Sequence, residues 1–192
     1  QGLPQRLLLP TSHERIKLLP ASTALATLER QSPGQSGLGL VIAKSLAQLW
    51  GEFDHAVIDS PPLLGILMVN ALAASQQLVI PVQTEFLAVK GLERMVSTLA
   101  MINRSRKQAL PYLIVPTLFD RRTQASMSTL RALRNSYPEQ LWPAYIPVDT
   151  RLRDASRAGL TPSQFDSNCR AVLAYRALLK HLLSLQPTAQ VA

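Results

Sequence analysis

The chain has 192 residues, of which 47% are hydrophobic, and a formal net charge of +8. That length suits one globular domain with a sizeable core, and the longest apolar run, Leu63–Ala74, is too short to span a bilayer. Cys169 is the only cysteine, which excludes an internal disulfide and favours a reducing, cytoplasmic compartment.

In the first quarter of the chain, apolar segments alternate with breaks. Ser22 is a helix-capping residue type, and the glycines of residues 31–39 are typical of a loop. Apolar residues then recur at helical spacing. The predicted elements are, in order, a strand over Arg15–Leu19, a helix over Ser22–Arg30, a loop over Gln31–Gly39 and a helix over Leu40–Trp50.

The most informative segment is Phe53–Gly65, FDHAVIDSPPLLG. Its apolar centre predicts a short buried strand over His55–Asp59, and two prolines then break it. A carboxylate at the carboxyl end of a buried strand lies where open α/β sheets bind ligands, and in P-loop NTPases it holds Mg²⁺. Asp59 is therefore a candidate metal-orienting residue; the alternative is a helix N-cap on the following turn.

The rest of the chain alternates helices and strands. The unbroken apolar centre of residues 77–81 suits a parallel sheet covered on both faces. The alternation predicts a doubly wound, mostly parallel α/β sheet with helices on both faces, in a single domain over residues 1–192 with a flexible tail over 186–192. The predicted elements are helices over Leu63–Ala74, Leu87–Asn103, Thr123–Tyr137 and Asn168–Leu185, and strands over Gln77–Pro81, Pro111–Thr117 and Trp142–Ile146.

Positive charge is concentrated in one part of the chain. Lys90–Arg157 holds 12 basic and 5 acidic residues, a net of +7 and nearly the whole excess. Clustered positive charge, mostly arginine, favours an anionic partner such as a nucleic acid backbone, and the alternative is a solvated face. No helix-turn-helix or zinc-finger pattern is present, so we expect no specific base reading.

The order and spacing of several motifs resemble the ParA/MinD class of partition ATPases. The resemblance implies a P-loop NTPase fold and covers the C-terminal two-thirds of such an ATPase. The family's K-G-G-x-x-x-K-T loop does not occur in this sequence, and the first methionine is Met68. We therefore expect an N-terminally truncated chain that does not hydrolyse ATP alone. The matching stretches are IKLLPASTALATLE (16–29), FDHAVIDSPPLLGILMVNALAAS (53–75), QLVIPVQTEFLAVKGLERM (77–95), LIVPTLFDRRT (113–123) and YIPVDTRLRDASRAG (145–159).

The resemblance also implies roles for residues of a nucleotide site, with ATP and Mg²⁺ as cofactors. Asp59 is the implied catalytic residue, which orients the Mg²⁺ shell through water. Thr117, Pro147 and Asp149 lie in loops that flank the adenine in this family. The alternative for these three is ordinary turn chemistry, since Pro and Asp are turn formers.

Arg122 and Arg151 match arginines that contribute to sequence-independent DNA binding in ParA proteins. Arginine contacts to phosphates carry affinity but no sequence information. The alternative is that these are surface arginines, or that they pair with Asp120 and Asp154.

The function implied by the resemblance is partitioning or intracellular positioning of DNA or a protein cargo. Such a bacterial protein is cytoplasmic and nucleoid-associated, forms an ATP-dependent homodimer, binds DNA non-specifically and is stimulated by a ParB-like or cargo-adaptor protein. One alternative is a MinD-like membrane-cycling ATPase. The uncharged tail 186–192 (QPTAQVA) argues against it, and we expect no membrane partner. The other is a non-enzymatic DNA-binding or adaptor module.

Overall fold

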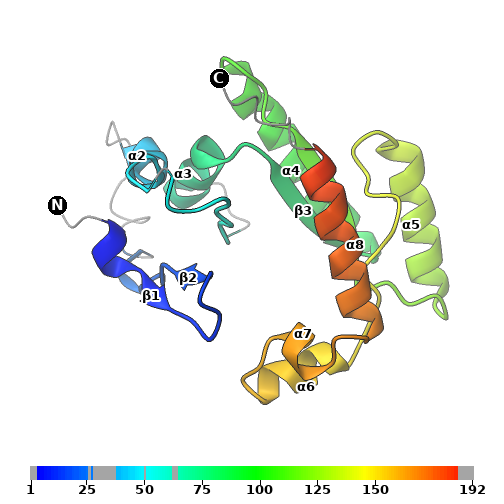
Figure 1. Ribbon diagram of the computed structural model, residues 1–192. Helices are drawn as coiled ribbons and strands as arrows, with labels where there is room; N and C mark the ends of the chain where they lie inside the picture. The colour runs from blue at the N-terminus through cyan, green and yellow to red at the C-terminus, as the bar shows by residue number, and fades with distance from the viewer. Residues whose placement is uncertain (1–3, 26, 28–37, 50, 62–64, 186–192) are drawn as a thin grey trace. The chain divides into compact units, whose positions relative to one another are not determined.

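The computed structural model describes residues 4–25, 27, 38–49, 51–61 and 65–185. The chain divides into two compact units, Gln1–Gln76 (unit 1) and Gln77–Ala192 (unit 2), which are described separately (Figure 1). No helix in these residue ranges is long and apolar enough to cross a membrane. The single domain over 1–192 stays a prediction, and the predicted tail over 186–192 lies outside the described residues.

Unit 1 begins with a small antiparallel hairpin. A 3-10 helix, η1 (Pro4–Leu7), precedes β1 (Leu9–Pro10), which pairs with β2 (Lys17–Leu18). The strand predicted over residues 15–19 is therefore confirmed only at its centre. Most of the predicted helix 22–30 and loop 31–39 lie outside the described residues.

Two helices of unit 1 are joined by one buried amide. Asn70 is 6% exposed, and its Oδ1 accepts hydrogen bonds from the backbone N–H groups of Val41 (2.9 Å) and Ile42 (3.3 Å). The first N–H groups of a helix have no partner within the helix, so Asn70 of the helix over residues 66–74 supplies the acceptor for the first N–H groups of the helix over residues 41–47. Both predicted helices are confirmed in shortened form, as α2 (Val41–Ala47), which follows η2 (Leu38–Leu40), and α3 (Ile66–Ala74).

The predicted strand over His55–Asp59 is wrong in this structure. Residues 53–61 contain neither helix nor strand, and Val57 is 97% exposed. A strand needs a neighbour with which to exchange backbone hydrogen bonds. Among the described residues of unit 1, the only paired strands are β1 and β2. Three apolar residues favour an extended, buried segment but do not specify its partner.

Unit 2 is built around two parallel strands. β3 (Leu78–Gln83) pairs with β4 (Tyr112–Thr117) in register, Leu78 opposite Tyr112 and Gln83 opposite Thr117. Both strands confirm the sequence prediction to within two residues at their ends. The apolar residues of β4 are buried on both faces, whereas in β3 the buried Ile80 and Val82 alternate with the exposed Pro81 and Gln83.

Alternate side chains of these strands enter two different cores. Ile80, Val82 and Ile114 pack with α4 (Phe86–Arg104) and α5 (Gln124–Ser136). Leu113 and Val115 pack on the other side with Leu178 of α8 (Arg170–Leu185). Figure 1 shows α8 crossing one side of the strands, with α4 and α5 beyond them. This is the layered arrangement that the sequence predicts, with helices on both faces of a parallel sheet.

The predicted strand over Trp142–Ile146 is replaced by two isolated bridges. Ile114 bridges to Leu141 and Phe119 to Pro147, both in the parallel sense. Pro143 has no N–H to donate within the intervening stretch, so a continuous ladder cannot form there. Trp142 still packs in the core, where it is 3% exposed.

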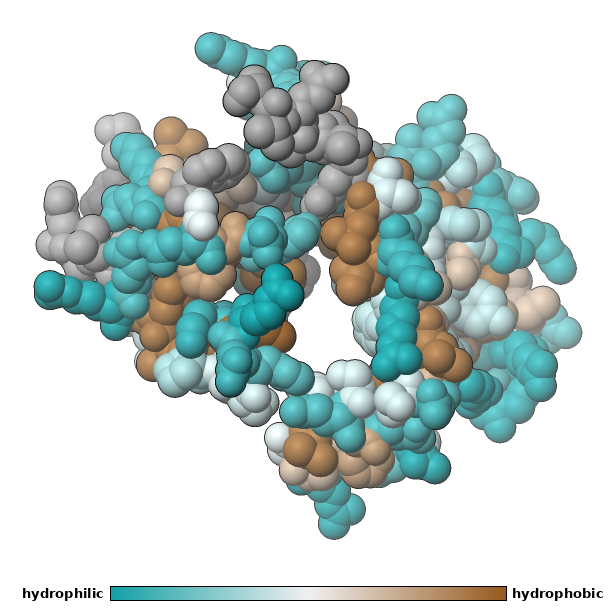
Figure 2. Space-filling view, in the orientation of Figure 1, coloured by the Kyte–Doolittle hydropathy of each residue, from teal (hydrophilic) through white to brown (hydrophobic). Residues whose placement is uncertain are grey.

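Two short helices between residues 150 and 166 were not predicted, although one carries a clear sequence signal. α6 (Arg151–Arg157) is followed by α7 (Pro162–Phe165). Thr161 and Gln164 form a capping box around α7, with a proline in its first turn. Apolar residues reach the surface in this part of unit 2, where Leu160 and Phe165 are exposed (Figure 2).

Candidate functional site

A pocket of about 310 Å³ lies beyond the carboxyl end of β4. Residues 119–122, residues 145–150 except Ile146, and Arg170 at the start of α8 line it. A second pocket of about 380 Å³ shares Arg121, Tyr145, Pro147 and Arg170 with it. Ligand sites of α/β folds are found at this end of parallel strands, and the pocket is therefore the candidate functional site.

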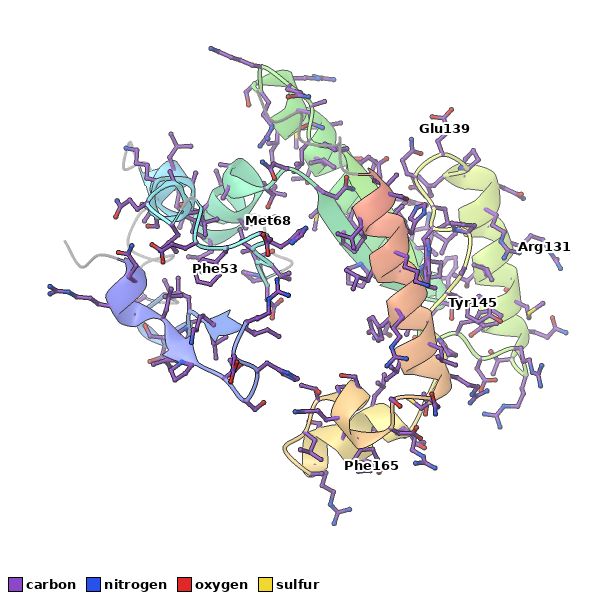
Figure 3. The ribbon with its side chains drawn as sticks, in the orientation of Figure 1. Phe53, Met68, Arg131, Glu139, Tyr145 and Phe165 are labelled. Carbon is purple, nitrogen blue, oxygen red and sulfur yellow. The ribbon has the colours of Figure 1, made fainter. Side chains whose placement is uncertain are left out.

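An aromatic pair forms one wall of the pocket. The ring centroids of Phe119 and Tyr145 lie 4.1 Å apart, tilted by 39°. Of the two, Tyr145 is labelled in Figure 3. Phe119 N–H donates to the Ile146 carbonyl at 3.1 Å, and Phe119 carbonyl accepts from Val148 N–H at 3.0 Å. These bonds hold the loop after β4 against the loop that precedes α6.

The chain turns sharply between β4 and this wall. Leu118 has φ +52°, the only positive φ of a non-glycine residue among the described residues. Only glycine adopts this conformation without cost, so surrounding contacts must hold Leu118 in it. The turn directs Phe119 into the core, where it is 6% exposed, and leaves residues 120–122 at the surface.

Asp120 and Arg122 form a close ion pair at the rim of the pocket. Arg122 Nη2 donates to Asp120 Oδ2 at 2.7 Å and Arg122 Nε to Oδ1 at 3.0 Å. Arg122 backbone N–H also donates to Oδ1 at 3.0 Å. The side chain of Asp120 is 21% exposed and that of Arg122 is 81% exposed. The hydrogen bonds from Arg122 lower the pKa of Asp120 from 3.8 to about 2, so its carboxylate is ionised at neutral pH.

Asp149 ties the second loop to α8. Its Oδ2 accepts from Ala171 N–H and its Oδ1 from Arg151 N–H, both at 3.1 Å. Partial burial raises the pKa of Asp149, but these two backbone hydrogen bonds and the charges of Arg170 and Arg151 outweigh it, so the pKa is lowered. The predicted turn chemistry of Asp149 is thus present, and it fixes the loop backbone at the pocket.

Arg151 pairs with a different carboxylate from the one that the sequence suggested. Its Nη1 lies 3.1 Å from Asp166 Oδ2, so the predicted alternative pairing with Asp154 is wrong. Asp154 is in the same short helix as Arg151, whereas Asp166 is brought near by α7, which was not predicted. The alternative pairing of Arg122 with Asp120 is confirmed.

The structure brings together some of the predicted site residues and not others. Pro147, Asp149 and Arg122 line one pocket, and Arg151 follows that lining directly in sequence. Thr117 ends β4, where its carbonyl accepts from Thr84 N–H at 3.1 Å, and it does not line the pocket. Asp59 is exposed in unit 1.

Sequence reasoning missed the aromatic wall and Arg170. Tyr145 is the first residue of the matching stretch 145–159, two residues before Pro147, but nothing in that stretch marks its ring as part of a pocket wall. Arg170 donates from Nη2 to the Val148 carbonyl at 3.4 Å, across a separation of 22 residues, and no local pattern marks that contact. Arg121, one of the basic residues of the segment Lys90–Arg157, lines both pockets.

Comparison with known proteins places this chain in a family. A sequence profile of the AAA domain family matches residues 5–112, which is more than half of the chain. The chain therefore belongs to this family and is a ParA-like member of it.

It is 28% identical over 180 residues to the chromosome partitioning protein ParA of Myxococcus xanthus, covering 93% of this chain and 64% of the relative. It is 27% identical over 173 residues to the sporulation initiation inhibitor protein Soj of Bacillus subtilis, covering 90% and 68%. The chain thus spans about two-thirds of the length of these curated relatives.

Solved structures confirm the fold class. A cobyrinic acid a,c-diamide synthase of Mycobacterium smegmatis, crystallised with an ATP analogue and magnesium, is 29% identical, with a TM-score of 0.74 over 96% of this chain and 70% of that one. The complex of a Cyanothece McdA variant with ATP has a TM-score of 0.81 over 98% and 74% at 18% identity, which shows the fold alone.

Proposed function

We propose that this protein is a ParA-like ATPase that partitions or positions DNA or a protein cargo. In this proposal an ATP-dependent dimer binds DNA without sequence preference, in the cytoplasm at the nucleoid, and a ParB-like or cargo-adaptor protein stimulates its release. The observation that carries the proposal is that Arg122, Pro147 and Asp149 line one pocket in a chain of this family.

The pocket has the features that a purine base requires. The aromatic wall of Phe119 and Tyr145 offers apolar area, and the backbone beside it, fixed by Asp149, offers polar groups that can read a base edge. We assign adenine contact to Pro147 and Asp149 directly. Thr117, which does not line the pocket, would contribute through the strand end on which the loop begins.

Asp59 is the residue to which we assign the Mg²⁺ that accompanies ATP. No group of three metal-ligating side chains occurs among the described residues. Mg²⁺ bound with a nucleotide takes one or two carboxylates and keeps several waters, so a single aspartate acting through water is compatible with it. When bound, the ion neutralises charge on the phosphates during phosphoryl transfer.

Arg122 and Arg151 are the residues to which we assign DNA contact. Both side chains are exposed, at 81% and 55%, although each already has a carboxylate partner. An exposed guanidinium has five N–H donors, and a carboxylate that takes two of them leaves the others for a phosphate oxygen. The pairs therefore restrict how each arginine is oriented without removing it from the surface.

A DNA-binding titration of the protein expressed from its complete gene, with ATP and Mg²⁺, tests the proposal. Arg122→Ala and Arg151→Ala should each weaken binding and reduce the salt slope by about one phosphate contact, while nucleotide binding is retained. Arg131→Ala is the matched control, because that exposed side chain points away from the sheet on α5 (Figure 3).

Unchanged DNA affinity in both variants would favour the alternative that these are solvated surface arginines without a role in DNA binding. If the DNA affinity is the same with and without ATP and the protein does not hydrolyse ATP, the adaptor module is favoured. In an active protein, Asp59→Ala should impair hydrolysis far more than thermal stability, and equal losses would favour the capping role.

A further inference from the structure

Two buried hydroxyl groups lie beneath the loop that carries Arg122. Thr84, which directly follows β3, is 1% exposed, and Ser126 in the first turn of α5 is 6% exposed. A buried hydroxyl is costly unless it is hydrogen-bonded. Thr84 Oγ1 donates to Ser126 Oγ at 3.0 Å, with the Leu118 carbonyl as a second acceptor at 3.4 Å. The pair joins the end of β3 to both ends of the loop after β4.

From this pair, hydrogen bonds lead to the backbone of Asp120. Ser126 Oγ accepts from Asp120 N–H at 3.4 Å. Thr123, the N-cap of α5, donates from Oγ1 to the Asp120 carbonyl at 3.1 Å and accepts from Ser126 N–H at 3.3 Å. Asp120 is thus held through both its N–H and its carbonyl. These bonds also supply the contacts that keep Leu118 at its positive φ.

The carboxylate of Asp120 then fixes the guanidinium of Arg122. Two guanidinium nitrogens and the backbone N–H of Arg122 donate to it. An exposed arginine has many rotamers, and ordering it on binding costs entropy. A side chain already held in one orientation loses less when it binds a phosphate. The buried end of this chain of bonds therefore influences a contact made at the surface.

We propose that Thr84 and Ser126 are positioning residues for Arg122, acting through Asp120 to hold the guanidinium ready for a phosphate of duplex DNA. This inference depends on the DNA contact assigned to Arg122 under the proposed function. Neither hydroxyl reaches Arg122 in the hydrogen bonds of the described residues, so their influence on DNA passes through the loop. Substitutions that remove these hydroxyls should consequently leave DNA affinity unchanged in a variant that lacks the Arg122 side chain.

A double-mutant cycle tests this inference in the protein expressed from its complete gene, with ATP and Mg²⁺. Thr84→Val removes the hydroxyl and keeps the volume, and Thr84→Ser keeps the hydroxyl. We expect Thr84→Val to weaken binding to a duplex of arbitrary sequence by about three- to tenfold, and Thr84→Ser to restore it. In the Arg122→Ala background, Thr84→Val should cause no further loss. Thermal unfolding of each variant shows whether the protein remains folded.

The arms of the experiment separate the two proposals. If Arg122→Ala leaves DNA affinity unchanged, the assigned DNA contact fails. If Arg122→Ala weakens binding but Thr84→Val does not, or if Thr84→Val costs the same with and without Arg122, the positioning role is overturned. Should Thr84→Val fail to fold, Ser126→Ala removes the next link of the same chain of bonds and is judged by the same criteria.

Discussion

The two units differ in what holds their residues in place. In unit 2, alternate side chains of β3 and β4 enter two apolar cores, and Ile114 and Leu133 are fully buried. In unit 1, the paired strands are two residues long and exposed, the buried apolar residues among those described are Leu49, Met68, Ala71 and Leu72, and the amide of Asn70 joins α2 to α3. The segment most easily matched to a known family, Phe53–Gly65, lies in unit 1, where its described residues 53–61 form no strand.

The difference shows that a recognisable motif and a formed element are separate properties. A motif is a pattern of residue types along the chain, whereas a strand exists only where a second strand supplies hydrogen-bond partners. Residues 78–83 have such a partner in β4, and residues 55–59 have none among the described strands.

The largest expected effect is the contrast between a core residue of unit 2 and an apolar residue of unit 1. Ile114→Ala should lower the free energy of unfolding by about 2–5 kcal/mol, because Ile114 is 0% exposed and the truncation leaves a cavity. Val57→Ala should change it by no more than about 0.5 kcal/mol, because Val57 is 97% exposed. Urea unfolding followed by circular dichroism measures both. A comparable loss in the two variants would show that residues 55–59 are buried in solution.

A smaller effect on the free energy of unfolding is expected from removing the side-chain acceptors at the first turns of α2 and α5. Asn70→Ala should cost about 1–3 kcal/mol, because it leaves the N–H groups of Val41 and Ile42 without their buried acceptor. Thr123→Ala should cost about 1 kcal/mol, since it removes the hydroxyl that accepts from Ser126 N–H at the start of α5 and donates to the Asp120 carbonyl. Urea unfolding of both variants compares the two losses in the free energy of unfolding. A larger loss for Thr123→Ala than for Asn70→Ala would contradict the stabilising role of the buried Asn70 amide.

The smallest effect is expected at acidic pH. Because the folded-state pKa of Asp120 is lowered from 3.8 to about 2, its contribution to stability is present above the ordinary pKa and is lost as the pH falls towards 2. Asp120→Asn should therefore reduce the difference in unfolding free energy between pH about 5 and pH about 2.5.

Asp54→Asn is the control for this measurement. It removes an ion pair with Arg15 in unit 1 whose side chains are 80% and 90% exposed, and such pairs contribute little. An acid response of Asp120→Asn identical to that of the wild type would show that the ion pair with Arg122 does not persist in solution.

Local sequence patterns predicted most of unit 2. Helical spacing located α4, α5 and α8, and apolar runs located β3 and β4. Buried positions recur with the period of each element and are occupied by apolar residues, so the sequence pattern predicts the element. The same reasoning predicted a continuous strand over Trp142–Ile146, where Pro143 interrupts the backbone hydrogen bonds, and it did not predict α6. The capping box of Thr161 and Gln164 would have revealed α7.

The candidate site was predictable only in part. Arg122, Pro147 and Asp149 were predicted from the resemblance of residues 113–123 and 145–159 to a known family, and all three line one pocket. The bonds that organise them, from Thr84 to Ser126 across 42 residues and from Asp149 to Ala171 across 22, join segments that only the folded chain brings together. Likewise, the partner of Arg151 depends on where α7 places Asp166, which no local pattern specifies.

The close pairing of Asp120 with Arg122 changes what a charge-removing substitution means at this surface. In the wild-type protein the two side chains form a dipole with its positive end outward, since the guanidinium is 81% exposed and the carboxylate 21%. Deleting the guanidinium leaves a carboxylate that stays ionised, so the local charge changes from neutral to negative rather than from positive to neutral. A phosphate approaching the Arg122→Ala surface would then meet repulsion as well as a missing donor, whereas the Asp120→Asn/Arg122→Ala pair of substitutions would present only the missing donor.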